Sequence, residues 1–123
     1  MQILWIGLFG GLGCTARYLM SGWVYNLFGR TLPYGTLVVN IGGSFLLGFL
    51  MIFGLRSTLL PVGLRVGLTV GFMGGFTTFS TFSYETLKLI EEGSLMQAGA
   101  NIVLNVLLCL ISVAAGMMLA RQL

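Results

Sequence analysis

The stretch GFMGGFTTFSTFSYE, residues 71–85, lies inside a long apolar region of the chain. It holds two adjacent glycines, a run of threonine and serine hydroxyls, and, among its phenylalanines, Phe79 and Phe82 three residues apart. Gly74-Gly75 frees the backbone to leave helical geometry. Non-helical backbone at membrane depth persists only where it is buried in protein or lines a cavity. The stretch therefore predicts a membrane-spanning helix that is broken at a site.

The composition around this stretch is that of an integral membrane protein. Of the 123 residues, 57% are hydrophobic and 7% are charged, whereas soluble domains carry about 25% charged residues. Apolar regions cover residues 3–28, 34–55, 62–90 and 98–120, and each reaches the roughly 20 residues that a membrane-spanning helix needs. The sequence predicts an all-α fold, a single domain over residues 1–123 with four transmembrane helices, the third broken at mid-membrane.

The inventory of reactive side chains leaves little room for catalysis. The chain has no histidine, its only carboxylates are Glu85, Glu91 and Glu92, and Cys14 and Cys109 fall inside predicted spans. A hydrolase would need a nucleophile with a base, a carboxylate pair or a metal site. We therefore expect no enzymatic activity, and the small net charge of +3 indicates no nucleic-acid partner.

The basic residues give only a weak signal for orientation in the membrane. Arg56, Arg65 and Arg121 fall on the side of both termini, and Arg30 and Lys88 fall on the other side. Three against two is a small bias under the positive-inside rule, so either other features fix the topology or the chain inserts both ways and pairs antiparallel. Because a four-helix bundle packs its own centre, a conduit requires more than one subunit, and we expect a homo-oligomer.

Several polar side chains lie inside the predicted spans, where they are costly and mark functional hypotheses. Arg17 either snorkels toward the interface or lines an aqueous vestibule, where its charge attracts anions. Asn40 either joins helices by hydrogen bonding or offers its two N–H donors to a ligand. The stripe in the fourth span is more typical of hydrogen bonding between helices: Asn101, Asn105 and Ser112.

Two further patterns indicate packing and membrane position. Gly67, Gly71 and Gly75 recur every four residues, a spacing that lets helix backbones approach closely in lipid. Tyr25 and Tyr34 fall near span ends, as in an interfacial aromatic belt, and we expect no further role for them.

The residues after the glycine pair suggest ion chemistry. If the helix resumes near Thr78, Phe79 and Phe82 fall on one face, where their positive ring edges can contact an anion. Either the rings are packing, as phenylalanine usually is, or they line a path that binds an anion weakly enough for conduction. The nearby break, asparagine and arginine favour the path. Carbonyls freed at such a break can hold a monovalent cation, and several hydroxyls can satisfy the backbone or donate to an anion: Thr77, Thr78, Ser80, Thr81 and Ser83.

These motifs resemble the CrcB/Fluc family of fluoride channels. The resemblance runs through the whole chain and rests on GGLGCTARY at residues 10–18, on GTLVVN at 35–40 with Gly43, and on GGFTTFSTFSYE at 74–85. It implies passive export of cytoplasmic fluoride through an antiparallel, dual-topology homodimer in a bacterial inner membrane. It also implies two separate fluoride pathways and a structural sodium ion on the two-fold axis.

The resemblance further implies roles for single residues. The sodium ligands would be the main-chain carbonyls of Gly74 and Thr77 from each subunit. Arg17 matches the vestibule arginine of the family. The fluoride pathway would use six side chains: Asn40, Phe79, Ser80, Thr81, Phe82 and Glu85.

Two other functions stay open. A small multidrug transporter is also a four-span, dual-topology dimer, but proton-coupled export of cations would want a membrane-embedded carboxylate. The first span holds Arg17 instead, and Glu85 lies near the end of the third. The other alternative is a non-conducting scaffold whose glycines serve assembly only. Ion flux separates the three functions.

Overall fold

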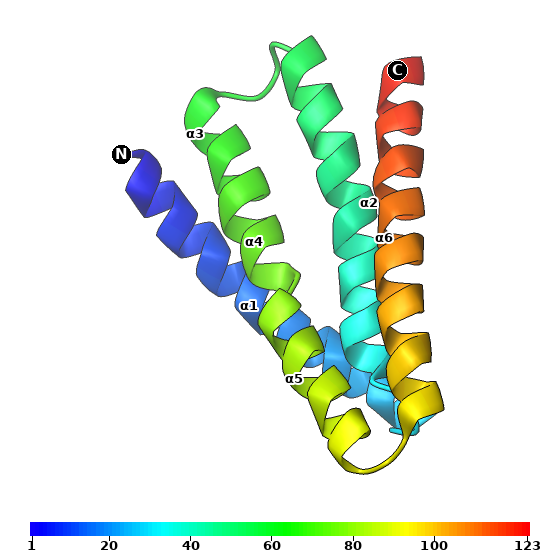
Figure 1. The fold of residues 1–123 in the computed structure, drawn as a ribbon. Coiled ribbons are helices and arrows are strands. Elements are labelled where there is room, and N and C mark those ends of the chain that lie inside the picture. Colours follow the sequence, from blue (N-terminus) through cyan, green and yellow to red (C-terminus); the bar gives the residue numbers. More distant parts are fainter.

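The computed structural model describes residues 1–123 as helices joined by short turns (Figure 1). Its elements are α1 (Gln2–Phe28), α2 (Tyr34–Arg56), α3 (Val62–Val66), η1 (Gly67–Phe72), α4 (Met73–Phe76), α5 (Phe79–Glu91) and α6 (Leu95–Gln122), where η1 is a π-helix. The elements α3 to α5 together form the third apolar span, Val62–Glu91. Four helices are thus long and apolar enough to cross a membrane, which confirms the predicted multi-pass membrane protein.

The loops that connect the helices lie at the two ends of the bundle. Both termini and the α2–α3 loop lie toward one end, and the α1–α2 and α5–α6 turns lie at the other (Figure 1). Gly29 and Gly93, which follow α1 and α5, both have a φ of 81°, a conformation that favours glycine. At the end with the termini, Arg56 Nη1 donates to the carbonyl of Arg121 at 2.6 Å, which satisfies an orphan acceptor at the end of α6.

Glycines set the distance between α1 and the third span. A Cβ at Gly71 would lie 2.8 Å from the carbonyl oxygen of Ile6, and one at Gly75 would lie 2.6 Å from that of Gly10. These are backbone contacts that no other residue would allow without a shift. The predicted close approach of helices is therefore confirmed along this contact.

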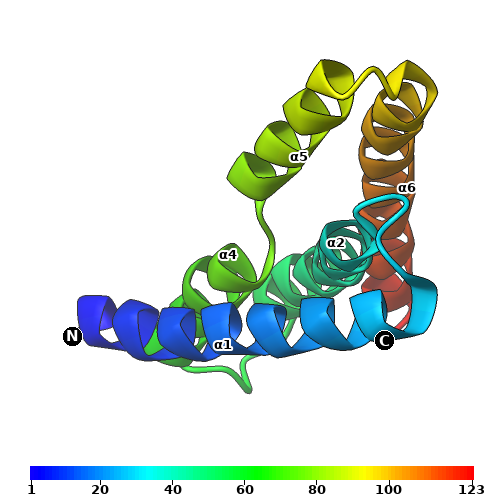
Figure 2. The ribbon, with the colours of Figure 1, turned by 90° about the horizontal axis from the view of Figure 1, so that it is seen from below.

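The helices α2 and α6 lie side by side along most of their length (Figures 1 and 2). They also meet through glycines: a Cβ at Gly48 would strike the carbonyl of Val113, and one at Gly116 would strike the carbonyl of Phe45. Few large side chains are buried, and the core cluster is only Val39, Met73 and Phe76. The leucine, isoleucine and valine side chains on the outer faces are exposed, as expected of surfaces that contact lipid.

The third span is broken as predicted, but the break lies beyond the glycine pair. Gly74 and Gly75 are helical members of α4, and the extended residues are Thr77 (φ −90°, ψ 158°) and Thr78 (φ −153°, ψ 120°). The prediction that Gly74-Gly75 forms the break is therefore wrong. Gly75 instead allows the contact with α1, and the helix ends because Asn40 Oδ1 accepts the N–H of Thr78 at 2.8 Å. After the break, α5 leaves the direction of α4 and runs toward the start of α6 (Figure 2).

Candidate functional site

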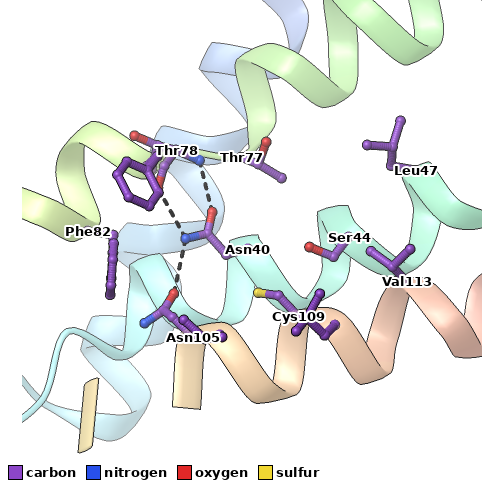
Figure 3. Close-up of a pocket in the computed structure, with 12 residues that line it drawn as sticks. Asn40, Ser44, Leu47, Thr77, Thr78, Phe82, Asn105, Cys109 and Val113 are labelled. Carbon is purple, nitrogen blue, oxygen red and sulfur yellow. Dashed lines mark hydrogen bonds between the residues drawn. The ribbon is translucent and has the colours of Figure 1, made fainter. Parts of the chain in front are cut away.

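Asn40 holds the unwound segment in place through a reciprocal pair of hydrogen bonds (Figure 3). The N–H of Thr78 donates to Asn40 Oδ1 at 2.8 Å, and Asn40 Nδ2 donates back to the Thr78 carbonyl at 3.1 Å. Asn40 Nδ2 also donates to Asn105 Oδ1 at 3.1 Å. Asn40 therefore joins α2, the break and α6, and an anion at this amide has to compete with Thr78 or Asn105 for its N–H groups.

The polar stripe of the fourth span continues this network toward α5. Asn105 Nδ2 donates to both Oδ1 and the carbonyl of Asn101 at 2.9 Å. Asn101 Nδ2 donates to Thr86 Oγ1 at 2.8 Å, and that hydroxyl donates to the carbonyl of Phe82 at 2.8 Å. Both asparagines are buried. Their expected role in joining helices is confirmed, and the chain of bonds runs from Asn40 to the helix that carries Phe82.

The break leaves the carbonyls of residues 74–77 without their helical donors, and those of Gly74 and Thr77 are two of the four. In a continuous helix the N–H of Thr78 would bond the carbonyl of Gly74, and the N–H of Thr81 would bond that of Thr77. The first N–H instead donates to Asn40, and the second donates to Thr78 Oγ1 at 3.2 Å, which caps α5. Gly74 and Thr77 are the residues whose carbonyls the family resemblance implies as sodium ligands.

A cavity of about 410 Å³ lies on one side of the segment and is mostly apolar. Asn40, Ser44, Thr77 and the two rings of Phe79 and Phe82 line it. The ring centroids are 5.4 Å apart and the planes are tilted by 55°. Phe82 is 9% exposed, whereas Phe79 is 77% exposed. The two rings therefore share a wall of one cavity, and the Phe79 ring is largely uncovered by the single chain.

A second cavity, of about 560 Å³, carries the charged groups. Arg17, Arg30, Thr81 and Glu85 line it. Arg17 Nε donates to the carbonyl of Gly75 at 3.0 Å, and the side chain is half-buried. Arg17 therefore lines the polar cavity and is anchored to Gly75 in the helix before the break.

Thr78 lines both cavities, so they meet at the unwound segment. Its hydroxyl donates to Thr81 Oγ1 at 3.1 Å, which joins a residue of the first cavity wall to one of the second. Ser80 lies outside both cavities and is exposed, at 3.4 Å from the Thr78 hydroxyl. The structure thus brings the predicted site residues together around Thr78, with Ser80 at the edge.

Comparison with known proteins identifies the family of this chain. The family model described as "CrcB-like protein, Camphor Resistance (CrcB)" matches residues 4–117. The chain belongs to the CrcB family.

Relatives of this CrcB chain are similar to it from end to end. A protein of Syntrophotalea carbinolica is 60% identical over 123 residues, all of both chains. A protein of Geobacter metallireducens is 56% identical over all of this chain and 99% of its own, and one of Geobacter sulfurreducens is 57% identical over 98% of each. All three are named fluoride-specific ion channel FluC.

Three residues of the CrcB chain have a larger part in the site than the sequence predicted. Thr78 forms the boundary of both cavities, and Asn105 is the direct partner of Asn40. The polar stripe of Asn101 and Asn105 predicted hydrogen bonding between helices, but it did not indicate Asn40 as the partner. Tyr25 was expected only in an aromatic belt, yet its hydroxyl donates to Glu85 Oε2 at 3.0 Å. No pattern in the sequence pointed to that bond.

Proposed function

We propose that this chain is a fluoride-specific ion channel that lets cytoplasmic fluoride leave the cell passively, without enzymatic chemistry. The observation that carries the proposal is the 56–60% identity, over the full length of the chain, to proteins named as such channels. The polar groups around the unwound segment support it. Fluoride is small and strongly hydrated, so a pore must replace its water with several donors of moderate strength.

The proposed path runs from the polar cavity to the aromatic one past Thr78. Arg17 raises the local anion concentration in the polar cavity, and the hydroxyl of Thr81 offers a donor there. Beyond Thr78, the ring edges of Phe79 and Phe82 stabilise the ion weakly. Neither the hydroxyl nor the ring edges bind the anion as tightly as an ammonium would, so the anion can leave again. Asn40 takes part in the path when one N–H of its amide leaves its protein acceptor, the Thr78 carbonyl or Asn105 Oδ1, and donates to the anion instead. Ser80 and Glu85 lie at the rim of the path.

We further propose that the carbonyls of Gly74 and Thr77 hold a structural sodium ion. Both have lost their helical donors, and neutral carbonyl oxygens at a helix break suit a monovalent cation. Gly74 and Thr77 together give two oxygens from a single chain, so a second copy related by a two-fold axis would complete the set. The bound ion would supply a fixed positive charge that neutralises the carbonyl dipoles of the two breaks. Replacing sodium by N-methylglucamine should lower the dimer fraction in detergent, and an unchanged dimer fraction would contradict the site.

An antiparallel dimer is the assembly that we propose for these copies. The exposed ring of Phe79 needs a partner surface if it is to line a closed path rather than face lipid. The nearly balanced arginine and lysine content of the two ends supports insertion in both orientations. Cysteine accessibility at positions on both ends of the bundle tests this, because a dual-topology protein is labelled at each position from either side.

Fluoride efflux from proteoliposomes, followed with a fluoride electrode, tests the function. Rapid efflux that needs no proton gradient supports the channel. Proton-dependent export of a cationic drug would instead indicate the multidrug transporter, and the absence of any flux would indicate a scaffold.

A further inference from the structure

Tyr25 and Glu85 form the only hydrogen bond between α1 and α5. The Tyr25 hydroxyl donates to Glu85 Oε2 at 3.0 Å, across 60 positions of sequence. Both residues line the polar cavity with Arg17 and Thr81. The bond therefore lies at the proposed anion path without being part of the break that forms it.

The Tyr25 ring is fixed by its own neighbours. The guanidinium carbon of Arg30 lies 4.4 Å from the ring centroid, a cation–π contact that favours this position of the ring. On α2, Gly35 leaves room for the ring, because a Cβ there would lie 2.5 Å from Tyr25 Cε2. The hydroxyl is thus presented to Glu85 by a ring that has little freedom to move.

Glu85 has no other partner for its charge. Its second oxygen, Oε1, is buried and accepts no hydrogen bond, a costly state for a carboxylate. Thr81 lies one helical turn before Glu85 on α5, so the two side chains are neighbours on one face. Thr81 Oγ1 accepts from Thr78 in the structure, which leaves the hydrogen of Thr81 free to donate.

A carboxylate beside an anion path has two ways to obstruct it. It repels the anion, and it competes for the same donors, here the Thr81 hydroxyl and the Arg17 guanidinium. We propose that Tyr25 is a positioning residue of this path, whose hydroxyl holds the Glu85 carboxylate against the cavity wall so that Thr81 and Arg17 remain available to the anion. The expected effect on fluoride flux rests on the proposed function, whereas the bond between Tyr25 and Glu85 does not.

The small number of carboxylates allows Glu85 to be observed alone. The chain has three acidic side chains, and Glu91 and Glu92 are exposed at the end of α5. In the Glu91→Gln/Glu92→Gln protein, labelled with glutamate carrying 13C in its carboxylate, Glu85 gives the only glutamate carboxylate signal. Tyr25→Phe should shift that signal and slow fluoride efflux about tenfold, the size expected for one hydrogen bond to a charged group. Tyr84→Phe is the matched control, since Tyr84 precedes Glu85, is 67% exposed and makes no hydrogen bond.

The two readouts separate this inference from the proposed function. A shifted signal with slowed efflux, both absent in Tyr84→Phe, supports the positioning role. An unshifted signal overturns the bond, and a shifted signal with unaltered efflux overturns the positioning role. If the parent protein carries no fluoride at all, the proposed function and the positioning role both fail, while the carboxylate signal still decides whether the bond exists. Size-exclusion profiles identify any variant that fails to fold; in that case Tyr25→Leu, which keeps an apolar side chain and has no donor, replaces Tyr25→Phe.

Discussion

The backbone N–H of Thr78 donates to the side chain of Asn40, which lies 38 residues earlier in the chain. This bond and its return, from Asn40 Nδ2 to the Thr78 carbonyl, replace the helical bonds that the third span gives up at this point. The break is therefore held open by a side chain of α2. The position and the shape of the site both depend on a contact between two helices.

Asn40→Asp should abolish fluoride efflux. A carboxylate can still accept the Thr78 N–H, but it faces the Thr78 carbonyl and Asn105 Oδ1, to which Asn40 now donates. It also adds a negative charge beside an anion path. We expect efflux at the level of protein-free liposomes and a stability loss of about 1–3 kcal/mol for the unpaired groups. Wild-type efflux from this variant would show that the amide contributes packing only.

Phe79→Ile and Phe82→Ile should each slow fluoride efflux about tenfold while the dimer still forms, because the ring-edge contribution to anion binding is lost. The proteoliposome assay measures the rate, and cross-linking measures the dimer. Phe53→Ile serves as the control, since that ring stacks on Phe49 within α2 at a centroid distance of 5.6 Å and lines neither cavity. Unaltered flux in both test variants would remove the rings from the mechanism.

Arg17 should act mainly through its charge. Arg17→Lys keeps the charge and Arg17→Gln removes it, so we expect the lysine variant to conduct faster. The difference between the efflux rates of the two variants should be larger at low ionic strength, where salt screens the charge of residue 17 less. Efflux assays at two salt concentrations measure it. If both variants lose the same flux at every salt concentration, the bond from Arg17 Nε to the Gly75 carbonyl is the part that matters.

The neighbouring glycines of α4 should respond differently to alanine. A Cβ at Gly75 would lie 2.6 Å from the Gly10 carbonyl, whereas one at Gly74 meets nothing within 4 Å. We expect Gly75→Ala to destabilise the fold by about 1–3 kcal/mol, as overpacking does, and Gly74→Ala to be tolerated because it keeps the carbonyl. Thermal unfolding in detergent measures both. Equal melting temperatures for the two variants would contradict the close contact between α1 and α4.

The presence of four apolar spans could be predicted because hydropathy reveals them, although the fourth helix, Leu95–Gln122, extends beyond the predicted residues 98–120 at both ends. The apolar character of residues 62–90 predicted the third span, and its elements together cover Val62–Glu91. The grouping of Phe79 with Phe82 also followed from helical spacing. Each of these features depends on residues that are close in the sequence.

The exact place of the break could not be predicted from local signals. Glycine has the lowest preference for a helix among ordinary residues, so Gly74-Gly75 was the natural choice. The helix ends at Thr77 because the donor of Thr78 is taken by Asn40, a contact that exists only after α2 has packed. The bond between Tyr25 and Glu85 is of the same kind, since neither residue carries a local signature of it.

We propose that the unwound residues Thr77 and Thr78 join two cavities into a path for fluoride. The most direct test is the efflux of fluoride and of chloride from proteoliposomes of the unaltered protein, each followed with an ion-selective electrode against protein-free liposomes. We expect rapid fluoride efflux, without a proton gradient, and chloride efflux no faster than in the protein-free control. Fluoride efflux equal to that of the protein-free liposomes would contradict this proposal.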